Sequence, residues 1–344
     1  MKIASALVLA LAATAAGAAE LNLGPKTLSY GVGIRVGAGY ENNAPQTGIS
    51  VPTLDVRPYI GTQVADWLKF NGNLDLNNAD GGRIHVLDAI AQFEPNDYFN
   101  LWLGRFLPPS DRANLSGPYF QNAWNYPTTV NGFPSVYAGR ADGGAIWGQL
   151  EKGKFKYQAG VFTLDTTTPI GEAIYAGRLV YEFLDPEPGY YNASTYYGAK
   201  RVLALGGTVQ YKKTVDPAAA TKELLGFDLD LLFEHPVAGG HVLSLEGAYY
   251  NFDQGNAAGK EGTSYYALAS WLFADKLGPG RVQPMVRWQH ARPPDGAQAI
   301  NTIDGGVNYI LDGHSARVAL VVQNTSLTSA TNQTNVQLGL QIQQ

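Results

Sequence analysis

Apolar and polar residues alternate along most of the chain, which would place every second side chain on the same face of a β-strand. Residues 28–41 alternate over fourteen positions, with Leu28, Val32 and Val36 at apolar positions and Arg35 at a polar one. Strands in soluble sheets usually have about five or six residues, whereas strands that cross a bilayer need about 9–11. The pattern therefore predicts strands that cross a membrane.

Sixteen segments of the chain show this alternation. They begin near residues 27, 53, 67, 84, 98, 142, 154, 175, 202, 224, 241, 263, 281, 302, 314 and 335. An even number of antiparallel strands places both chain ends on the periplasmic side, so that the connections alternate between the two sides. We assign residues 41–52, 78–83, 107–140, 164–174, 213–223, 253–262, 292–301 and 324–334 to the cell exterior. The link 184–201, assigned to the periplasm, is unusually long for that side.

These segments predict an all-β fold, a transmembrane antiparallel β-barrel of about sixteen strands over residues 20–344. Shifting the first strand by one residue would turn Arg35 toward lipid, where a basic side chain costs about 2–4 kcal/mol. Near residue 84 the apolar positions change parity between Val86 and Leu87, which is typical of a β-bulge. A soluble β-sandwich or a β-solenoid is the competing architecture, but strands of this length argue against it.

The first nineteen residues have the pattern of a secretory signal peptide. Lys2 gives a positive start, residues 3–16 are apolar, and small residues follow at 16–19. We expect cleavage after Ala18 or Ala19, and we assign residues 1–19 to the signal peptide. An N-terminal membrane anchor is the alternative, but the apolar run is too short to span a bilayer. The protein is therefore expected to be exported.

Composition excludes several classes of function. Cysteine is absent, which excludes a disulfide scaffold, a thiolate metal site and a cysteine nucleophile. The formal charge of −5 argues against broad nucleic-acid binding. The five histidines are scattered without metal-ligand spacing, and the serine nucleophile elbow and the phosphate-binding loop are both missing. We therefore expect no enzyme activity, no cofactor, no metal site and no nucleic-acid partner.

Residues at polar parity are expected to line the lumen of the barrel. The basic ones are Arg35, Arg57, Lys69, Lys154, Lys156, Arg178, Lys212, Arg287 and Arg317. The acidic ones are Asp55, Asp75, Asp88, Glu182, Asp228, Asp230, Glu234, Glu246 and Asp304. Rings of one charge select ions, whereas this wall carries nine basic and nine acidic side chains. We predict a water-filled pore with weak charge selectivity; the alternative for any one of these residues is an ordinary wall position or a cross-strand ion pair.

The connection 107–140 is the sharpest candidate site, because a loop of this length is usually functional or disordered. Its prolines would stiffen it. The residues expected to line a constriction are Asp111, Arg112, Asn114, Gln121, Asn122 and Asn125. Its aromatic residues, which would offer a surface to a sugar or another semi-polar solute, are Tyr119, Phe120, Trp124, Tyr126, Phe133 and Tyr137. A surface loop packed on the barrel mouth or at a subunit contact is the alternative.

Five short stretches resemble the phosphate-selective porin O and P family. They are Leu101-Trp102-Leu103-Gly104-Arg105-Phe106 with Pro108-Pro109, Trp147-Gly148-Gln149-Leu150 leading to Tyr157-Gln158-Ala159-Gly160-Val161-Phe162, Gly177-Arg178-Leu179-Val180-Tyr181, Val282-Gln283-Pro284-Met285-Val286-Arg287-Trp288, and Gly306-Val307-Asn308-Tyr309-Ile310-Leu311. The resemblance runs from about residue 27 to the end of the sequence. It implies a trimeric sixteen-stranded diffusion channel, general or anion-preferring, with the third external loop folded into the lumen.

Two features depart from that family. Its anion selectivity depends on clusters of Arg and Lys in the lumen and constriction, but residues 107–140 contain only Asp111, Arg112 and Arg140 as charged residues. We therefore do not extend phosphate selectivity to this chain. Barrels of this kind also usually end in an aromatic residue, whereas the last position here is Gln344.

Together these observations predict a passive outer-membrane porin of a Gram-negative bacterium. It would sit in outer-membrane lipid as a homotrimer and pass small hydrophilic solutes or ions with weak charge selectivity. One alternative is a barrel scaffold that encloses an electron-transfer or secretion partner. Another is a surface adhesin or receptor, although most of the external connections are short for that role.

Overall fold

The computed structural model describes residues 19–23, 26–43, 46–77, 82–127, 139–163, 173–213, 223–253, 262–292, 299–327 and 332–344. The predicted signal peptide therefore lies outside the described residues, apart from Ala19. So do Phe133 and Tyr137 of the long loop. No helix in the described part of the chain is long and apolar enough to cross a membrane.

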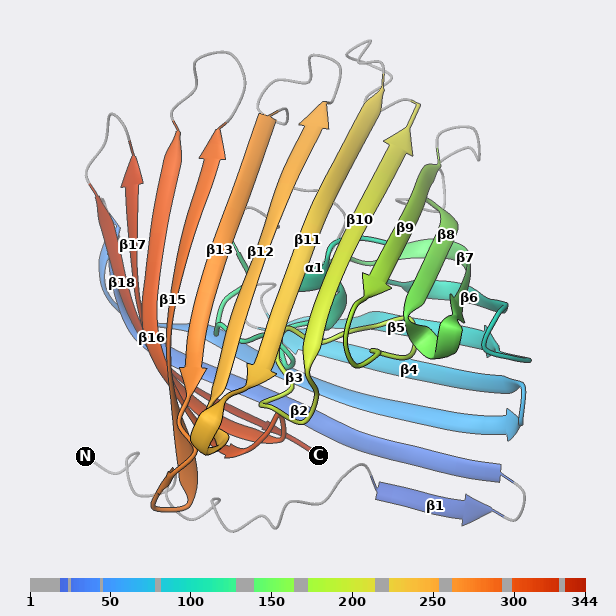
Figure 1. Ribbon diagram of the computed structural model, residues 1–344, viewed down its shortest axis with the longest axis horizontal. Coiled ribbons are helices and arrows are strands. Elements are labelled where there is room, and N and C mark those ends of the chain that lie inside the picture. The colour runs from blue at the N-terminus through green and yellow to red at the C-terminus, as the bar shows by residue number, and fades with distance from the viewer. Residues whose placement is uncertain are drawn as a thin grey trace.

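Sixteen antiparallel strands form a closed barrel (Figure 1). Their bounds are β2 (Lys26–Asn43), β3 (Gln46–Ala65), β4 (Leu68–Asn77), β5 (Ile84–Phe93), β6 (Asn100–Phe106), β7 (Ala141–Leu150), β8 (Phe155–Thr163), β9 (Ile174–Glu182), β10 (Val202–Lys212), β11 (Leu224–Pro236), β12 (Val242–Asp253), β13 (Gly262–Leu272), β15 (Gly280–Arg292), β16 (Ile300–Asp312), β17 (Ala316–Leu327) and β18 (Gln333–Gln343). Each strand pairs with the next along the chain, and β18 pairs with β2 to close the barrel. The predicted all-β, sixteen-stranded barrel is confirmed.

Two further strands lie outside this ring of sixteen. β1 (Ala19–Leu23) pairs with the first residues of β2, and β14 (Lys276–Leu277) pairs with the start of β15. The helical parts are short: α1 (Arg112–Ser116), η3 (Glu151–Gly153) and η5 (Ala238–Gly240). Tight turns such as β16–β17 lie at one end of the barrel, called the turn end. The opposite end, where β6 leads into the long connection to β7, is called the loop end.

Side chains alternate between the two faces of the wall, as the sequence pattern predicts. On β11, Phe227, Leu229 and Leu231 are exposed, while Asp228 and Asp230 between them are buried. The same arrangement recurs around the barrel: apolar residues lie outside and charged residues lie inside, the reverse of a soluble protein. A wall of this kind suits an apolar solvent outside and a polar interior.

The structure corrects the predicted start of the second strand. β3 begins at Gln46 instead of near residue 53, so most of residues 41–52 belong to a long β2–β3 hairpin. Its pairing register shifts between Gly37 and Gly39, which interrupts the alternation around Val51 and Pro52. The bulge predicted in β5 is present, because Asn73 pairs with Asp88 and Leu74 with Val86.

The last residue continues the barrel closure. The amide of Gln344 donates to the carbonyl of Val32, and the amide of Val32 donates to the carbonyl of Gln344. Ladder pairing between the first and last strands of the barrel therefore does not require an aromatic residue at position 344.

Candidate channel constriction

The third long connection folds into the barrel, as the sequence predicts. Residues 107–127, called the loop segment, cross the interior between β6 and the opposite wall (Figure 1). Arginines of three wall strands donate hydrogen bonds to its carbonyls: Arg35 to Trp124, Arg287 to Asn125 at 2.9 Å, and Arg317 to Gln121 at 2.7 Å. These contacts fasten the loop segment to the β15–β18 and β2 side of the barrel.

Trp124 is the main apolar contact of the loop segment with that wall. Its ring is buried against Ala319 and Val321 and lies 4.1 Å from the guanidinium carbon of Arg35. A Cβ atom on Gly339 would lie 2.5 Å from this ring, so Trp124 can pack this closely against β18 only because residue 339 is glycine. Because Trp124 fills this contact, it does not line an open constriction.

Gly33 on β2 permits a second close approach. A Cβ atom at this position would stand 2.7 Å from the ring of Tyr119. The Tyr119 ring is also within 5.8 Å of the Arg57 guanidinium carbon. Burial raises the pKa of Tyr119, while the charges of Arg57 and Arg35 lower it, so the phenol stays neutral at physiological pH.

The root of the loop segment is held by buried charges. Asp111 caps α1 by accepting from the Asn114 amide, and it also accepts from the hydroxyl of Tyr250 at 2.9 Å. Burial and the nearby charge of Asp230 raise the pKa of Asp111 to about 6. Arg112 is 1% exposed and pairs with Glu187. Neither Asp111 nor Arg112 faces open space in the lumen.

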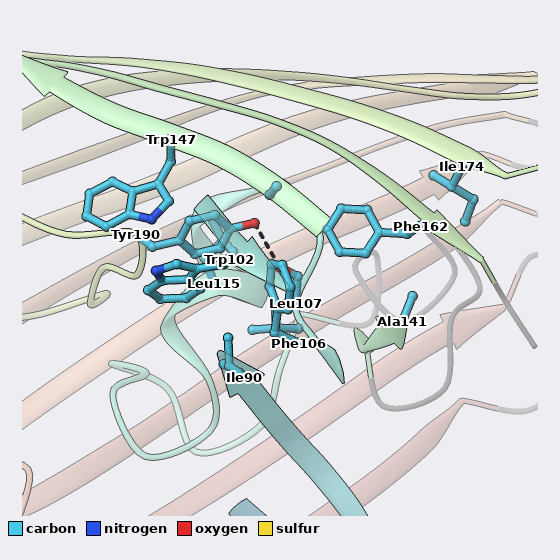
Figure 2. Close-up of a cluster of buried hydrophobic side chains, with 11 residues drawn as sticks. Ile90, Trp102, Phe106, Leu107, Leu115, Ala141, Trp147, Phe162, Ile174 and Tyr190 are labelled. Carbon is cyan, nitrogen blue, oxygen red and sulfur yellow. Dashed lines mark hydrogen bonds between the residues drawn. The ribbon is translucent and has the colours of Figure 1, made fainter. Parts of the chain in front are cut away.

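A second segment enters the barrel from the turn end. Residues 183–201, called the turn-end segment, connect β9 to β10 and fold back inside. The hydroxyl of Tyr190 donates to the carbonyl of Leu107 at 2.9 Å, a bond drawn in Figure 2. The unusual length of this link was visible in the sequence, but its entry into the lumen was not predicted.

Strands β5 to β9 carry the largest buried apolar cluster of the interior, next to buried polar side chains such as Lys156 and Arg178. Figure 2 shows a buried cluster of Ile90, Trp102, Phe106, Leu107, Leu115, Ala141, Ala145, Trp147, Phe162, Ile174 and Tyr190. Tyr190 stacks on Trp102 with 4.6 Å between ring centroids. This packing fills the β5–β9 sector, just as the loop segment fills the opposite one.

A cavity of about 670 Å³ remains between these two filled sectors. Wall residues Arg57, Tyr59, Asn73 and Asp88 line it. Residues of both inner segments also line it, among them Pro118, Tyr119, Phe120, Tyr191, Asn192 and Tyr196. The cavity extends toward the turn end, where His314 and Gln344 line it.

Charges at the cavity occur in pairs of opposite sign. Arg57 contacts Asp75 at 2.7 Å, and Arg140 contacts Asp88 at 3.2 Å. Burial raises the pKa of Tyr126, and the charges of Arg140 and Arg57 lower it. The charged side chains that line the cavity therefore form neither a ring of positive charge nor a ring of negative charge.

Most of the predicted lumen residues face the interior but are engaged in buried contacts. Arg178 pairs with Asp230 at 2.5 Å and lies 3.8 Å from Asp228. Further buried contacts join Lys156 to Glu182 at 3.6 Å, Arg287 to Asp304 at 2.7 Å and Arg35 to Asp55 at 3.6 Å, and Tyr266 donates to Glu246 at 2.7 Å. Lys69 pairs with Glu94 at 2.7 Å, but its side chain is 40% exposed. Lys212 and Glu234 are also buried inside. Of the predicted charged wall residues, Arg57 and Asp88 reach the cavity surface.

Lys154 departs from its predicted place. It lies in the turn between η3 and β8 and is exposed, because the strand begins one residue later at Phe155. Among the predicted loop residues, Tyr119 lines the cavity, whereas the Asn114 amide group donates to Ser110 at 2.8 Å. Gln121 and Asn122 are buried against the wall.

Solved structures share this architecture. OmpT, an outer membrane protein of Vibrio cholerae, is 11% identical and matches 95% of this chain and 100% of its own with a TM-score of 0.62. An anion-selective porin from Comamonas acidovorans is 13% identical over 93% of this chain and 100% of its own, with a TM-score of 0.64. OprB of Pseudomonas putida is 12% identical over 92% of this chain and 94% of its own, with a TM-score of 0.66. The fold is that of a porin.

No protein-family model and no curated protein sequence matches the chain. The resemblance to known proteins is thus established at the level of a porin-type barrel. Membership of the phosphate-selective O and P family is not confirmed and stays a prediction.

Proposed function

We propose that this protein is a passive diffusion channel for small hydrophilic solutes or ions. One observation carries the proposal: a closed barrel with an apolar exterior holds a cavity lined by polar and aromatic side chains, and the chain's own inner segments narrow it. No reacting group or cofactor is needed for diffusion through such a space. We accordingly propose a channel and not an enzyme.

We propose that its charge selectivity is weak. Ion selectivity in channels arises from rings of like charge or from aligned carbonyl dipoles. Here Arg57 and Arg140 each stand beside a carboxylate, so their fields largely cancel at the distance of a passing ion. The loop segment adds aromatic rings to the cavity but no basic cluster.

The proposed location is the outer membrane of a Gram-negative bacterium, reached through cleavage of residues 1–19. The exposed apolar belt would contact lipid, and the turn end would face the periplasm. We further propose a homotrimer, which the porin O and P resemblance implies; one V. cholerae OmpT structure is described as a trimer form.

Planar lipid bilayers test this function. The purified protein should produce stable open steps, and its reversal potential in a gradient of potassium chloride should lie near zero. Absence of steps from correctly folded protein would contradict the channel. A large reversal potential of either sign would contradict weak selectivity alone.

A scaffold for a protein partner is disfavoured by the same cavity. A space of about 670 Å³ is of the size that holds a small molecule, not a folded domain. Co-purification of a haem protein with a non-conducting barrel would reverse this conclusion.

A further inference from the structure

The loop segment has a partner that enters the barrel from the other end. We infer that the turn-end segment forms the second side of the constriction, and that Glu187 fixes the position of the loop segment through Arg112. The inference rests on the proposed channel function and adds to it a positioning residue outside the long external loop.

The two segments are joined by a set of direct contacts. Arg112 donates to both carboxylate oxygens of Glu187, at 2.7 and 2.5 Å, and to the carbonyl of Ala193 at 2.7 Å. The side chains of Arg112 and Glu187 are each 1% exposed. Two-point pairing of this kind fixes the orientation of both partners as well as their distance. The amide of Ser194 also donates to the carbonyl of Phe120 at 3.0 Å.

The turn-end segment is itself anchored to the wall, independently of the loop segment. Near its start, Lys156 on β8 donates to the carbonyl of Glu187 at 2.7 Å. Further along, the carboxylate of Glu234 on β11 accepts from the Thr195 hydroxyl at 2.7 Å and from the Gly198 amide at 2.8 Å. These hydrogen bonds to β8 and β11 fix the position of Glu187, so that Arg112 binds to a carboxylate that is already in place.

Arg112 keeps the buried carboxyl group of Glu187 ionised. Burial alone would raise its pKa, but the charge of Arg112 and its hydrogen bonds lower the pKa to about 2. The pair stays ionised at physiological pH. Removing one member would leave the other charge buried without its main partner, which is strongly unfavourable.

The turn-end segment also borders the opening directly. Tyr191, Asn192 and Tyr196 line the cavity together with Arg57 and Asp88 of the wall. Tyr191 lines the same cavity as the ion pair of Asp88 and Arg140. The residues that limit passage thus come from both ends of the barrel.

Single-channel recording of two variants tests the inference. Glu187→Gln keeps the side-chain shape but removes the charge, and we expect a changed step size with greater open-channel noise because the loop segment is released. Asp185→Asn is the matched control, since Asp185 pairs with the exposed Arg201 at the rim and not with the loop segment. Equal, wild-type steps from Glu187→Gln and Asp185→Asn would overturn the role of Glu187.

Because the chain contains no cysteine, a thiol reagent can react only with a cysteine that is introduced, which allows a second test. A cationic methanethiosulfonate reagent should reduce the current through Tyr191→Cys, while Leu179→Cys on the lipid-facing side of β9 should show no loss. If Glu187→Gln does not fold, Tyr191→Cys tests whether the turn-end segment borders the path of the current. An unaffected Tyr191→Cys current in a conducting channel would overturn the inference, whereas a wild-type protein without conductance would overturn the proposed function instead.

Discussion

The guanidinium carbon of Arg35 lies 4.1 Å from the ring of Trp124, joining the first barrel strand to the middle of the inner loop. The same arginine donates to the Trp124 carbonyl, so one wall residue holds both the ring and the backbone of the loop. Arg317 approaches the ring from another strand, at 5.7 Å. Arg35 and Arg317 therefore position the inner loop, and neither of them lines the cavity, unlike Arg57.

Replacing Trp124 should loosen the loop from the wall. Removal of a fully buried aromatic side chain typically costs about 3–5 kcal/mol. Trp124→Ala should lower the denaturant midpoint in detergent micelles and raise single-channel conductance. Phe120→Ala is the control for stability alone, because Phe120 is 40% exposed and its removal should cost less, although it also lines the cavity. Equal falls in the unfolding midpoint for the two substitutions would contradict the assigned role of Trp124.

The close approach at Gly33 gives a second prediction. Gly33→Ala places a methyl group 2.7 Å from the Tyr119 ring, so the loop has to shift, and overpacking of this kind costs about 1–3 kcal/mol. Its unfolding midpoint should fall and its step size should change. Gly305→Ala on β16 is the control, because no heavy atom lies within 4 Å of the added carbon. An unchanged unfolding midpoint and step size in Gly33→Ala would mean that the loop does not pack closely against β2.

His314 predicts a pH dependence of stability. Burial and the charge of Arg317 lower its pKa from 6.5 to about 4, and its Nε2 hydrogen bonds to the carbonyl of Thr195 at 2.9 Å. As the pH falls from 6.5 toward 4, the unfolded chain takes up a proton that the folded chain does not. Folding stability should therefore fall over this range, by up to about 3 kcal/mol.

The variant His314→Gln isolates this contribution. It should show a flatter dependence of the unfolding free energy between pH 7 and pH 4 than the wild type. Contributions from Asp111 and Glu187 are common to both proteins and cancel in the difference. Identical pH profiles would show that protonation of His314 is not linked to unfolding.

The paired charges at the cavity predict opposite shifts in selectivity. Asp88→Asn removes the negative charge beside Arg140 and should move the reversal potential toward anion preference. Arg57→Gln removes the positive charge beside Asp75 and should move it toward cation preference. Measurement in a salt gradient checks both directions. Shifts of the same sign would contradict the balance of charges proposed for the constriction.

The wall of the barrel could be predicted from sequence because alternation is a local property. Fifteen of the sixteen predicted strands begin within two residues of their observed starts. The exception, β3, begins at Gln46 because the irregular pairing near Gly37 and the prolines Pro52 and Pro58 disrupt the pattern. The bulge in β5 was visible as a change of parity.

The interior could be predicted only in outline. Composition and length indicated that the loop enters the lumen, but which side chains remain open to the cavity depends on contacts between residues far apart in sequence. Asp111 and Arg112 are charged loop residues that turn away from the cavity because Tyr250 and Glu187 meet them. Tyr191 belongs to a link whose only sequence signal was its length.

The central claim is that the loop segment narrows a water-filled pore, and single-channel conductance tests it most directly. A variant lacking residues 113–135 should form the same barrel and show larger open steps than the wild type under identical salt. Steps of unchanged size would show that the loop does not limit the current, and a complete lack of steps from both folded proteins would show that the barrel is not a pore.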